Sequence, residues 1–569
     1  DLIIGNLGTI KMIFQGFQRL SETANPNFIG SNFDAVLSFI NGVKIFIKQG
    51  RFNYYPGDWY WIPSRTIPGE SITEFPFFTF LYADPHAHLF AYPITLLAIS
   101  WMLSILFNKW RSLKGKSMEF WLTFLIGGVI LGSLRPTNTW DFPTYISLSA
   151  VIIFYKIFRY VQPPEWFLNY LPKKARAIIY SLSIVCLFIG ISYFLYYPFT
   201  RWYGQGYKAI DIWKGSRTPL FSYLTHWGIF LFFILTWLIW EVRDWMANTP
   251  ISALRKVKPY KNLILFAGFL VVAIIGILLL KGVYISWLVI TLILISILLI
   301  FRRNQSDAKR FVLLIIILGL TLTITVELIV LRGDIGRMNT VFKFYIQAWT
   351  FLAIGSSMSL VLLIPDIRLK WTSNWRKVWE PVAIILLGFG AMFPVIASAD
   401  KIRDRMSHDV PLTLDGMQYM ESSKYREGDY LMELDQDYYA IQWMQDNVEG
   451  SPVIVEANTT EYHWGNRFTI YTGLPGVVGW NWHQRQQRAI LPSTWVTDRV
   501  NEIQTFYCTE DQVQALAFLR KYDVKYIILG QLEKELYSSQ GLNKFDLFEG
   551  VLWKTVYCDR DTKILEVLD

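Results

Sequence analysis

Two consecutive stretches, residues 262–280 (NLILFAGFLVVAIIGILLL) and 283–301 (VYISWLVITLILISILLIF), decide the fold class. Both are apolar along almost their whole length. A helix of about 20 residues, rising about 1.5 Å per residue, crosses a hydrocarbon layer about 30 Å thick. Only Lys281 and Gly282 separate the two stretches. The sequence therefore predicts two membrane-spanning helices joined by a tight turn.

The composition extends this prediction to most of the chain. Of 569 residues, 53% are hydrophobic and 17% are charged, whereas soluble domains carry about 25% charged residues. This composition excludes a soluble enzyme, and three cysteines exclude a disulfide scaffold. We expect a polytopic α-helical membrane protein with about ten spans. They lie near residues 86–107, 119–134, 139–160, 177–197, 219–240, 262–280, 283–301, 311–331, 343–364 and 379–396.

The net charge of +9 arises largely from lysines and arginines in alternate loops between the spans. These basic loops lie near residues 109–116, 156–176, 243–261, 302–310 and 368–377. Positive loops face the cytoplasm, so this pattern indicates membrane topology rather than nucleic-acid binding. We expect a multi-pass protein of the cell (plasma) membrane, with the other loops and the C-terminal part outside the cytoplasm.

The chain divides into three predicted parts. Residues 1–85 form an extracytoplasmic or interfacial segment with amphipathic helices, and residues 86–397 form the transmembrane helical domain. Residues 398–569 contain no spanning run. There, expected helices at 437–448 and 509–522 are followed by expected strands at 453–456 and 524–529. Two such helix-then-strand units predict an extracytoplasmic soluble α/β domain.

Polar clusters at the outward ends of the spans are the candidate sites. The first contains Asp84, His86 and His88, which can bind a metal ion or supply a general base. The alternative is that Asp84 caps the following helix while both histidines lie at the wet interface. The second contains Arg135, which can hold a phosphate, and Asp141, which can orient that arginine or bind a metal. Its alternative is a simple turn with an aspartate cap.

Two further clusters combine cations with other polar or aromatic groups. Tyr196 and Tyr197 precede Arg201, and such rings either anchor the chain at the membrane interface or stack on sugars. The stretch 332–343 suits a phosphate or diphosphate, unless it forms a structural ion-pair network in which Glu327 pairs with one of the cations. Its candidate side chains are Arg332, Arg337, Asn339 and Lys343.

The C-terminal part contains a loop rich in glycine and tryptophan, with His463, Trp480 and His483. Its aromatic and amide groups suit carbohydrate, and ordinary loop packing is the alternative. The chain lacks the Walker spacing and the G-x-G-x-x-G fingerprint, so nucleotide binding has no support.

Four motifs in these clusters resemble the YYY membrane family, which is placed near the C-type glycosyltransferases. They are TEFPFFTFLYADPHAH at 73–88, RPTNTWD at 135–141, GRMNTVFK at 336–343 and YTGLPGVVGW at 471–480. Family members begin with further spans and acidic external segments, and this leading part of the pattern is missing before Asp1. Another chain could supply it as a partner.

The resemblance and the clusters together lead to one predicted activity. We expect a membrane glycosyltransferase that moves a sugar from a polyprenyl-phosphate donor to an acceptor at the outer membrane face. The alternative is a non-catalytic scaffold subunit or a transporter of lipid-linked substrates. Asp84, His86, His88 and Asp141 are the catalytic candidates, and the first three also form the candidate site for a divalent metal (Mg, Mn or Ca). Candidate donor ligands are Arg135, Arg201, Arg332, Arg337, Asn339 and Lys343, and candidate acceptor ligands are Tyr196, Tyr197, His463, Trp480 and His483.

Overall fold

The computed structural model describes residues 3–24, 32–69, 71–108, 117–203, 209–250, 252, 255, 258–406, 409–488, 491–492 and 494–568. It contains two compact units, which are treated separately below. The first (the membrane unit) comprises Asp1–Arg201 and Tyr207–Asp404, and the second (the C-terminal unit) comprises Trp202–Gly206 and Arg405–Asp569. The basic residues predicted near 109–116, and some of those near 243–261, lie outside the described residues.

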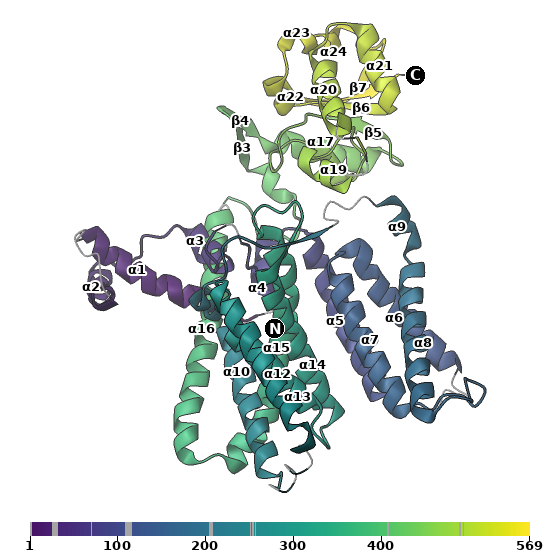
Figure 1. Cartoon of the computed structure of the whole chain (residues 1–569). Coiled ribbons are helices and arrows are strands. Elements are labelled where there is room, and N and C mark those ends of the chain that lie inside the picture. Colours follow the sequence, from purple (N-terminus) through teal and green to yellow (C-terminus); the bar gives the residue numbers. More distant parts are fainter. Residues whose placement is uncertain are drawn as a thin grey trace. The chain divides into compact units, whose positions relative to one another are not determined.

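Within the described residues, nine helices are long and apolar enough to cross a membrane (Figure 1). They are α5 (Ala87–Phe107), α6 (Ser117–Thr137), α7 (Asp141–Tyr160), α8 (Lys173–Phe194), α10 (Leu220–Ala247), α12 (Lys261–Leu280), α14 (Asp307–Leu328), α15 (Met338–Lys370) and α16 (Ser373–Arg405). A tenth apolar helix, α13 (Ser286–Ile300), has only 15 residues. The polytopic helical fold is thus confirmed.

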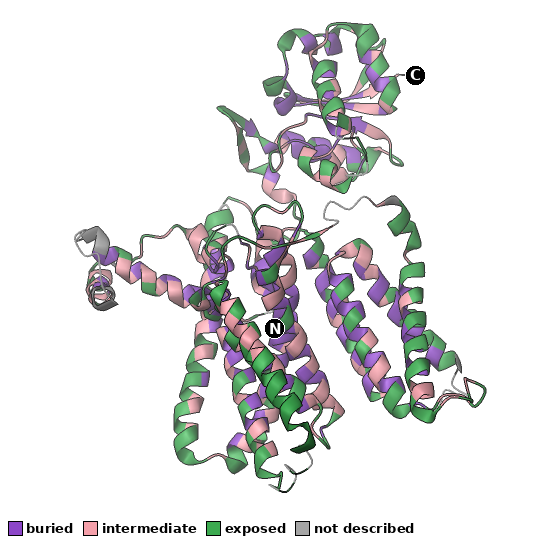
Figure 2. Ribbon diagram, in the orientation of Figure 1, coloured by how far each residue is buried: buried purple, intermediate pink, exposed green. Residues whose placement is uncertain are grey.

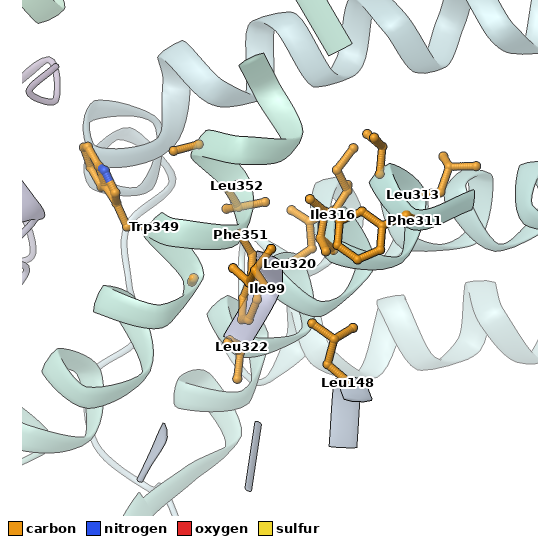
Figure 3. Close-up of a cluster of buried hydrophobic side chains, with 14 of the residues drawn as sticks. Ile99, Leu148, Phe311, Leu313, Ile316, Leu320, Leu322, Trp349, Phe351 and Leu352 are labelled. Atoms are coloured by element: carbon orange, nitrogen blue, oxygen red, sulfur yellow. The ribbon is translucent and has the colours of Figure 1, made fainter. Parts of the chain in front are cut away.

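The core of the membrane unit lies where α14 packs against α15 (Figure 3). Gly319 of α14 faces Leu352, and Gly355 of α15 faces Ile316, so closely that a Cβ atom at either glycine would lie within 3 Å of the partner side chain. Small residues at such positions let two helix backbones approach each other. Ile99 of α5 and Leu148 of α7 join the same buried cluster, so these two helices pack on the α14–α15 pair.

Helix α12 differs from the others because none of its residues is buried (Figure 2). It is also the most apolar of the spanning helices, with a mean hydropathy of 3.2 over its best window. An exposed helix that is apolar on every side suits a lipid environment rather than water. This helix therefore faces the hydrocarbon of the bilayer.

The segment before the first span contains a pair of packed helices, α1 (Gly8–Ala24) and α2 (Asn32–Gln49). Gly42 permits their contact, because a Cβ atom there would lie 1.7 Å from the carbonyl oxygen of Phe17. Short elements follow: α3 (Pro56–Trp61), η1 (Ile62–Ser64) and α4 (Pro76–Tyr82). The remaining short elements of the membrane unit are α9 (Tyr197–Trp202), β1 (Ile210–Ile212), η3 (Lys258–Tyr260) and β2 (Ile329–Leu331). The sequence predicted a helix through residue 331, but α14 ends at Leu328 and β2 pairs with β1 instead.

The C-terminal unit is built on a four-stranded sheet of order β5-β6-β8-β7. Strand β5 (Val453–Val455) is parallel to β6 (Val524–Leu529), whereas β8 (Thr562–Val567) is antiparallel to both β6 and β7 (Trp553–Asp559). A hairpin of β3 (Lys424–Glu427) and β4 (Tyr430–Glu433) precedes the sheet. The other elements are η4 (Gln418–Glu421), α17 (Leu434–Asn447), α18 (Arg467–Thr472), α19 (Asn481–Gln487), α20 (Thr494–Cys508), α21 (Gln512–Tyr522), α22 (Gln531–Leu536), α23 (Ser539–Leu542) and α24 (Lys544–Leu547).

A buried ionic network holds the helices of this unit to its sheet. Arg467 is 1% exposed, and it donates to Asp437 Oδ2 at 2.6 Å and to Glu533 Oε2 at 2.9 Å. Its Nη1 also lies 3.8 Å from Glu456 Oε2. One guanidinium thus serves three buried carboxylates, which come from α17, the start of α22 and the residue after β5. Burial raises the pKa of Glu456 to about 7, although Arg467 opposes this shift.

We expect the stability of the C-terminal unit to fall as the pH rises from about 4.5 to about 7. Because the folded pKa of Glu456 exceeds its ordinary value of 4.5, the folded state holds the proton more tightly than the unfolded chain does. The contribution is therefore complete below about pH 4.5 and is lost by about pH 7, at a cost of roughly 3 kcal/mol at most. Pulse proteolysis of the full chain in urea, at several pH values, measures this loss of stability. In Glu456→Gln, which stays neutral, this part of the pH dependence should disappear, and an unchanged slope would contradict the assignment.

Candidate functional site

Helices α5 and α7 of the membrane unit both begin beside α15, α5 against its second turn and α7 against its third. The His88 ring of α5 lies 4.6 Å from the Phe342 ring of α15. Gln347 of α15 donates to the carbonyl oxygen of Trp140, the residue before α7, at 3.1 Å. Helix N-termini carry unpaired N–H groups and a partial positive charge. This end of the bundle therefore favours an anion.

Charged and polar side chains surround the starts of α5 and α7, and we name them the α5–α7–α15 cluster: Glu74, Asp84, His86, His88, Asp141, Lys343 and Gln347. Asp141 is 3% exposed at the first position of α7. Half-buried Lys343 interacts electrostatically with Asp141 and also with His88. The structure therefore brings together residues from three predicted clusters. They are His88 from the first, Asp141 from the second and Lys343 from the fourth.

Several buried polar atoms in and beside this cluster have no hydrogen-bond partner among the described residues. They are His88 Nε2, Asp141 Oδ1, Gln347 Oε1 and Arg135 Nη1. Leaving such a group unpaired costs about 1–3 kcal/mol. A bound polar molecule that offers both donors and acceptors would remove this cost. The cluster is thus built to bind a polar or anionic group.

Asp84 and His86 lie at the exposed rim of the cluster. His86 Nδ1 lies 2.6 Å from Asp84 Oδ2, and both side chains are nearly half exposed. His86 occupies the N-cap position of α5, and no side chain caps this helix, so Asp84 is paired with His86 rather than serving as a cap. Nearby, burial raises the pKa of Glu74, and Arg65, 3.4 Å away, opposes that shift.

The predicted metal ligands do not converge on one point. Asp84 pairs with His86, whereas His88 Nε2 faces Glu74 Oε2 at 3.8 Å. In the part of the chain that the structure describes, no three His, Cys, Asp or Glu side chains are grouped closely enough to hold a metal ion. The arrangement does not fit a divalent metal held by Asp84, His86 and His88, and that metal stays a sequence-based prediction.

Arg337 belongs to a separate buried ion pair at the end of α14. It is 4% exposed and its Nη1 donates to Oε1 of Glu327 at 2.6 Å, where Glu327 is 0% exposed. Arg337 Nη2 donates to Thr218 Oγ1 at 2.9 Å, and the Thr218 N–H donates to Glu327 Oε2 at 3.0 Å. Arg217 binds the carbonyl oxygen of Glu327. Glu327 therefore pairs with a cation of the stretch 332–343, as expected. Around Arg337, this stretch forms a structural ion-pair network, which was the alternative to a phosphate site.

The structure does not bring Arg332 and Arg337 together. Arg332 is 67% exposed and pairs with the exposed Asp211 at 2.8 Å. Asn339 is used in the first turn of α15, where its N–H and its side-chain amide both donate to Asp334 Oδ1 at 3.1 Å. Of the four candidates in this stretch, only Lys343 lies in the α5–α7–α15 cluster.

The aromatic candidates near α8 lie in the turn after α8 and at the start of α9, outside that cluster. Tyr197 is 60% exposed and begins the short helix α9, which also carries the exposed Arg201. The Tyr196 hydroxyl donates to the carbonyl oxygen of Val129 in α6 at 3.1 Å. Arg135 lies in the last turn of α6, and its guanidinium stacks over the Tyr193 ring, 4.4 Å from the ring centroid.

In the C-terminal unit, two of the three candidates share an aromatic group. The rings of Trp480 and His483 lie 5.5 Å apart, and His483 Nε2 lies 3.1 Å from the hydroxyl of Tyr462. His463 is instead paired with Glu427 of β3, at 3.1 Å. Trp480 Nε1 is buried without a partner among the described residues.

A family model described as "Uncharacterized membrane protein (DUF2298)" matches residues 2–352. The chain belongs to this family. The matched range contains all residues of the α5–α7–α15 cluster and ends before α16 and the C-terminal unit. The family description names no activity, and the resemblance to the YYY membrane family stays a prediction.

Among solved structures, this DUF2298 member is similar to the Archaeoglobus fulgidus oligosaccharyltransferase tethered with an acceptor peptide, with 14% sequence identity and a TM-score of 0.30. The match covers 92% of the DUF2298 chain and 57% of that chain, so the chain spans little more than half the length of this neighbour. A comparison with curated proteins found no match.

Sequence reasoning missed some residues of the α5–α7–α15 cluster and of the network around Glu327. Gln347 was not considered, although it lies four positions after Lys343 and therefore on the same helix face. Its polarity within an apolar run was the available signal. Glu74 was part of a recognised motif but was given no role. No local pattern signals the contact of Thr218 with Glu327, because 109 residues separate them in sequence.

Proposed function

We propose that this chain is a membrane glycosyltransferase that takes a sugar from a polyprenyl-phosphate donor at the α5–α7–α15 cluster. The observation that carries the proposal is the placement of the N-termini of α5 and α7 beside Lys343 of α15 and the buried Asp141. Such a site stabilises a phosphate, both as bound donor and as leaving group. In this proposal the chain lies in the cell membrane with the C-terminal unit outside the cytoplasm.

The proposed reaction breaks the bond between the sugar C1 atom and the donor phosphate oxygen, and forms a bond from C1 to an acceptor oxygen. The acceptor proton passes to a carboxylate at the rim, for which we assign Asp84, because His86 holds it at 2.6 Å and it remains accessible. The phosphate leaves with the electron pair of the broken bond. Lys343 and the helix N-termini stabilise its negative charge.

We expect Lys343→Met to lower sugar release about 100-fold, because the leaving phosphate loses its cation. The assay uses the full chain in nanodiscs with a polyprenyl-phosphate hexose whose sugar is radiolabelled, and native membrane extract as the source of acceptor. Lys281→Met is the matched control, because Lys281 is an exposed lysine that directly follows α12.

The control variant should release sugar at the wild-type rate. Equal rates for Lys343→Met and the wild type would contradict the role of Lys343. Wild-type protein that releases no sugar from any polyprenyl-phosphate hexose would contradict the proposed function itself.

A further inference from the structure

Helices α6 and α8 enclose an apolar groove on the membrane unit. Its volume is about 840 Å³, and its lining includes Met118, Trp121 and Leu125 of α6, with Gly190, Ile191 and Phe194 of α8. Both helices are long and apolar enough to span the membrane. The groove is therefore open to the hydrocarbon of the bilayer, and a lipid chain is the kind of molecule that fits it.

The groove is longer than one leaflet of the bilayer. Its lining begins at Met118, next to the start of α6, and reaches Phe194 at the last position of α8. Gly128 of α6 lies against Ile191 of α8, so Phe194 is level with about Leu131 of α6. From Met118 to that level the groove is about 20 Å long, at about 1.5 Å per residue. Half of the hydrocarbon thickness is only about 15 Å. An ordinary acyl chain would fill part of such a groove, whereas a long isoprenoid chain follows all of it.

A cation lies at the end of the groove that is nearest the α5–α7–α15 cluster. Trp121, Leu125, Gly128, Gly132 and Arg135 follow one another at steps of three or four residues, so Arg135 continues the helix face that lines the groove. Its guanidinium stacks on Tyr193, beside the lining residue Phe194, and on Phe142, the neighbour of Asp141. Its Nη1 is buried without a partner in the described part of the chain. A guanidinium with such a donor suits phosphate.

Glycines shape the width of the groove. A Cβ atom at Gly128 or Gly132 would lie within 3 Å of Ile191 or Tyr196, so α6 and α8 approach each other closely there. At Gly190 the situation is the reverse, because a Cβ atom would meet no atom within 4 Å. The missing side chain at Gly190 therefore keeps the groove open.

We propose that this groove holds the isoprenoid chain of a polyprenyl phosphate, whose phosphate accepts a hydrogen bond from Arg135 Nη1. The inference rests on the proposed function and adds to it the place of the lipid part of the donor. Arg135 then holds the phosphate at the mouth of the groove, next to the helix that begins with Asp141.

The test is photo-cross-linking of the full chain in nanodiscs of zwitterionic phospholipid, with a diazirine-bearing polyprenyl monophosphate as the probe. Gly190→Leu fills the groove, and Gly268→Leu on the exposed helix α12 is the matched control, because neither Cβ atom meets a neighbour within 4 Å. Both substitutions raise helix propensity by the same amount. We expect cross-links on α6 and α8, and about tenfold less cross-linking in Gly190→Leu but wild-type yield in Gly268→Leu. Arg135→Gln should weaken probe binding about tenfold.

Three results would overturn the proposal: cross-links spread evenly over lipid-facing helices such as α12, unchanged cross-linking of Gly190→Leu, or complete displacement of the probe by excess phosphatidylglycerol. The last result would assign the groove to ordinary phospholipid. The two proposals fail separately. Cross-linking in the groove without sugar release overturns the transferase, whereas sugar release that Gly190→Leu leaves unchanged overturns the groove.

Discussion

Replacing Arg467 by methionine is expected to destabilise the C-terminal unit by about 3–5 kcal/mol, because three buried carboxylates lose their shared cation. Asp437 and Glu533 are within hydrogen-bond distance of the guanidinium, and both are at most 3% exposed. Arg467 also holds the pKa of Glu533 below its ordinary value, against the effect of burial. Without the arginine, the carboxylates must take up protons or admit water, and either process favours the unfolded chain.

Pulse proteolysis of the full chain in urea measures this loss for the C-terminal unit. Arg520→Ala, in the exposed last turn of α21, is the control and should change the unfolding free energy by no more than about 0.5 kcal/mol. The double variant Arg467→Met with Glu533→Gln should recover part of the loss, since one of the unpaired charges is removed. Similar stability of Arg467→Met and Arg520→Ala would contradict the network as the support of this unit.

Replacing Arg337 by methionine is expected to destabilise the membrane unit by a similar amount, about 3–5 kcal/mol, because the fully buried Glu327 would lose its cation partner. The neighbouring Arg332 is the matched control. Its pair with Asp211 is exposed to solvent, and exposed pairs contribute about 0–1 kcal/mol. Thermal unfolding in nanodiscs distinguishes the two variants. Unfolding is monitored by proteolysis of the loop that connects α14 to α15.

These two arginines also separate a structural role from a functional one. If both held a donor phosphate, both substitutions would weaken donor binding and leave stability nearly unchanged. The geometry leads us to expect that only Arg337→Met lowers the melting temperature. Equal melting temperatures for Arg337→Met and Arg332→Met would contradict the ion pair between Arg337 and Glu327.

The membrane helices could be predicted from the sequence because lipid imposes one requirement on every residue of a span. The expected span at 139–160 agrees closely with α7 (Asp141–Tyr160), and the expected strand at 524–529 has the bounds of β6. Long apolar runs and short apolar strands each carry a local signal. The strands β7 and β8 were not expected. Their apolar residues alternate only weakly with polar ones, so the local sequence carries little strand signal.

The site was harder to predict because spacing along the chain does not show which charges meet. Arg332 and Arg337 lie five residues apart, yet one is exposed and the other is buried. Lys343 and Asp141 interact although they belong to different motifs. The motifs therefore named the polar residues, and tertiary contacts decided which of them lie close together.

The shortness of α13 has a consequence for the surrounding lipid. Its 15 residues rise about 22 Å, roughly 8 Å less than the hydrocarbon thickness. Such hydrophobic mismatch is relieved when the bilayer thins locally, at a cost of a fraction of a kcal/mol per Å. Tyr284 and Phe301, which are 57% and 82% exposed at the two ends of α13, are placed to anchor a thinned interface. The bilayer should consequently be locally thinner beside α13.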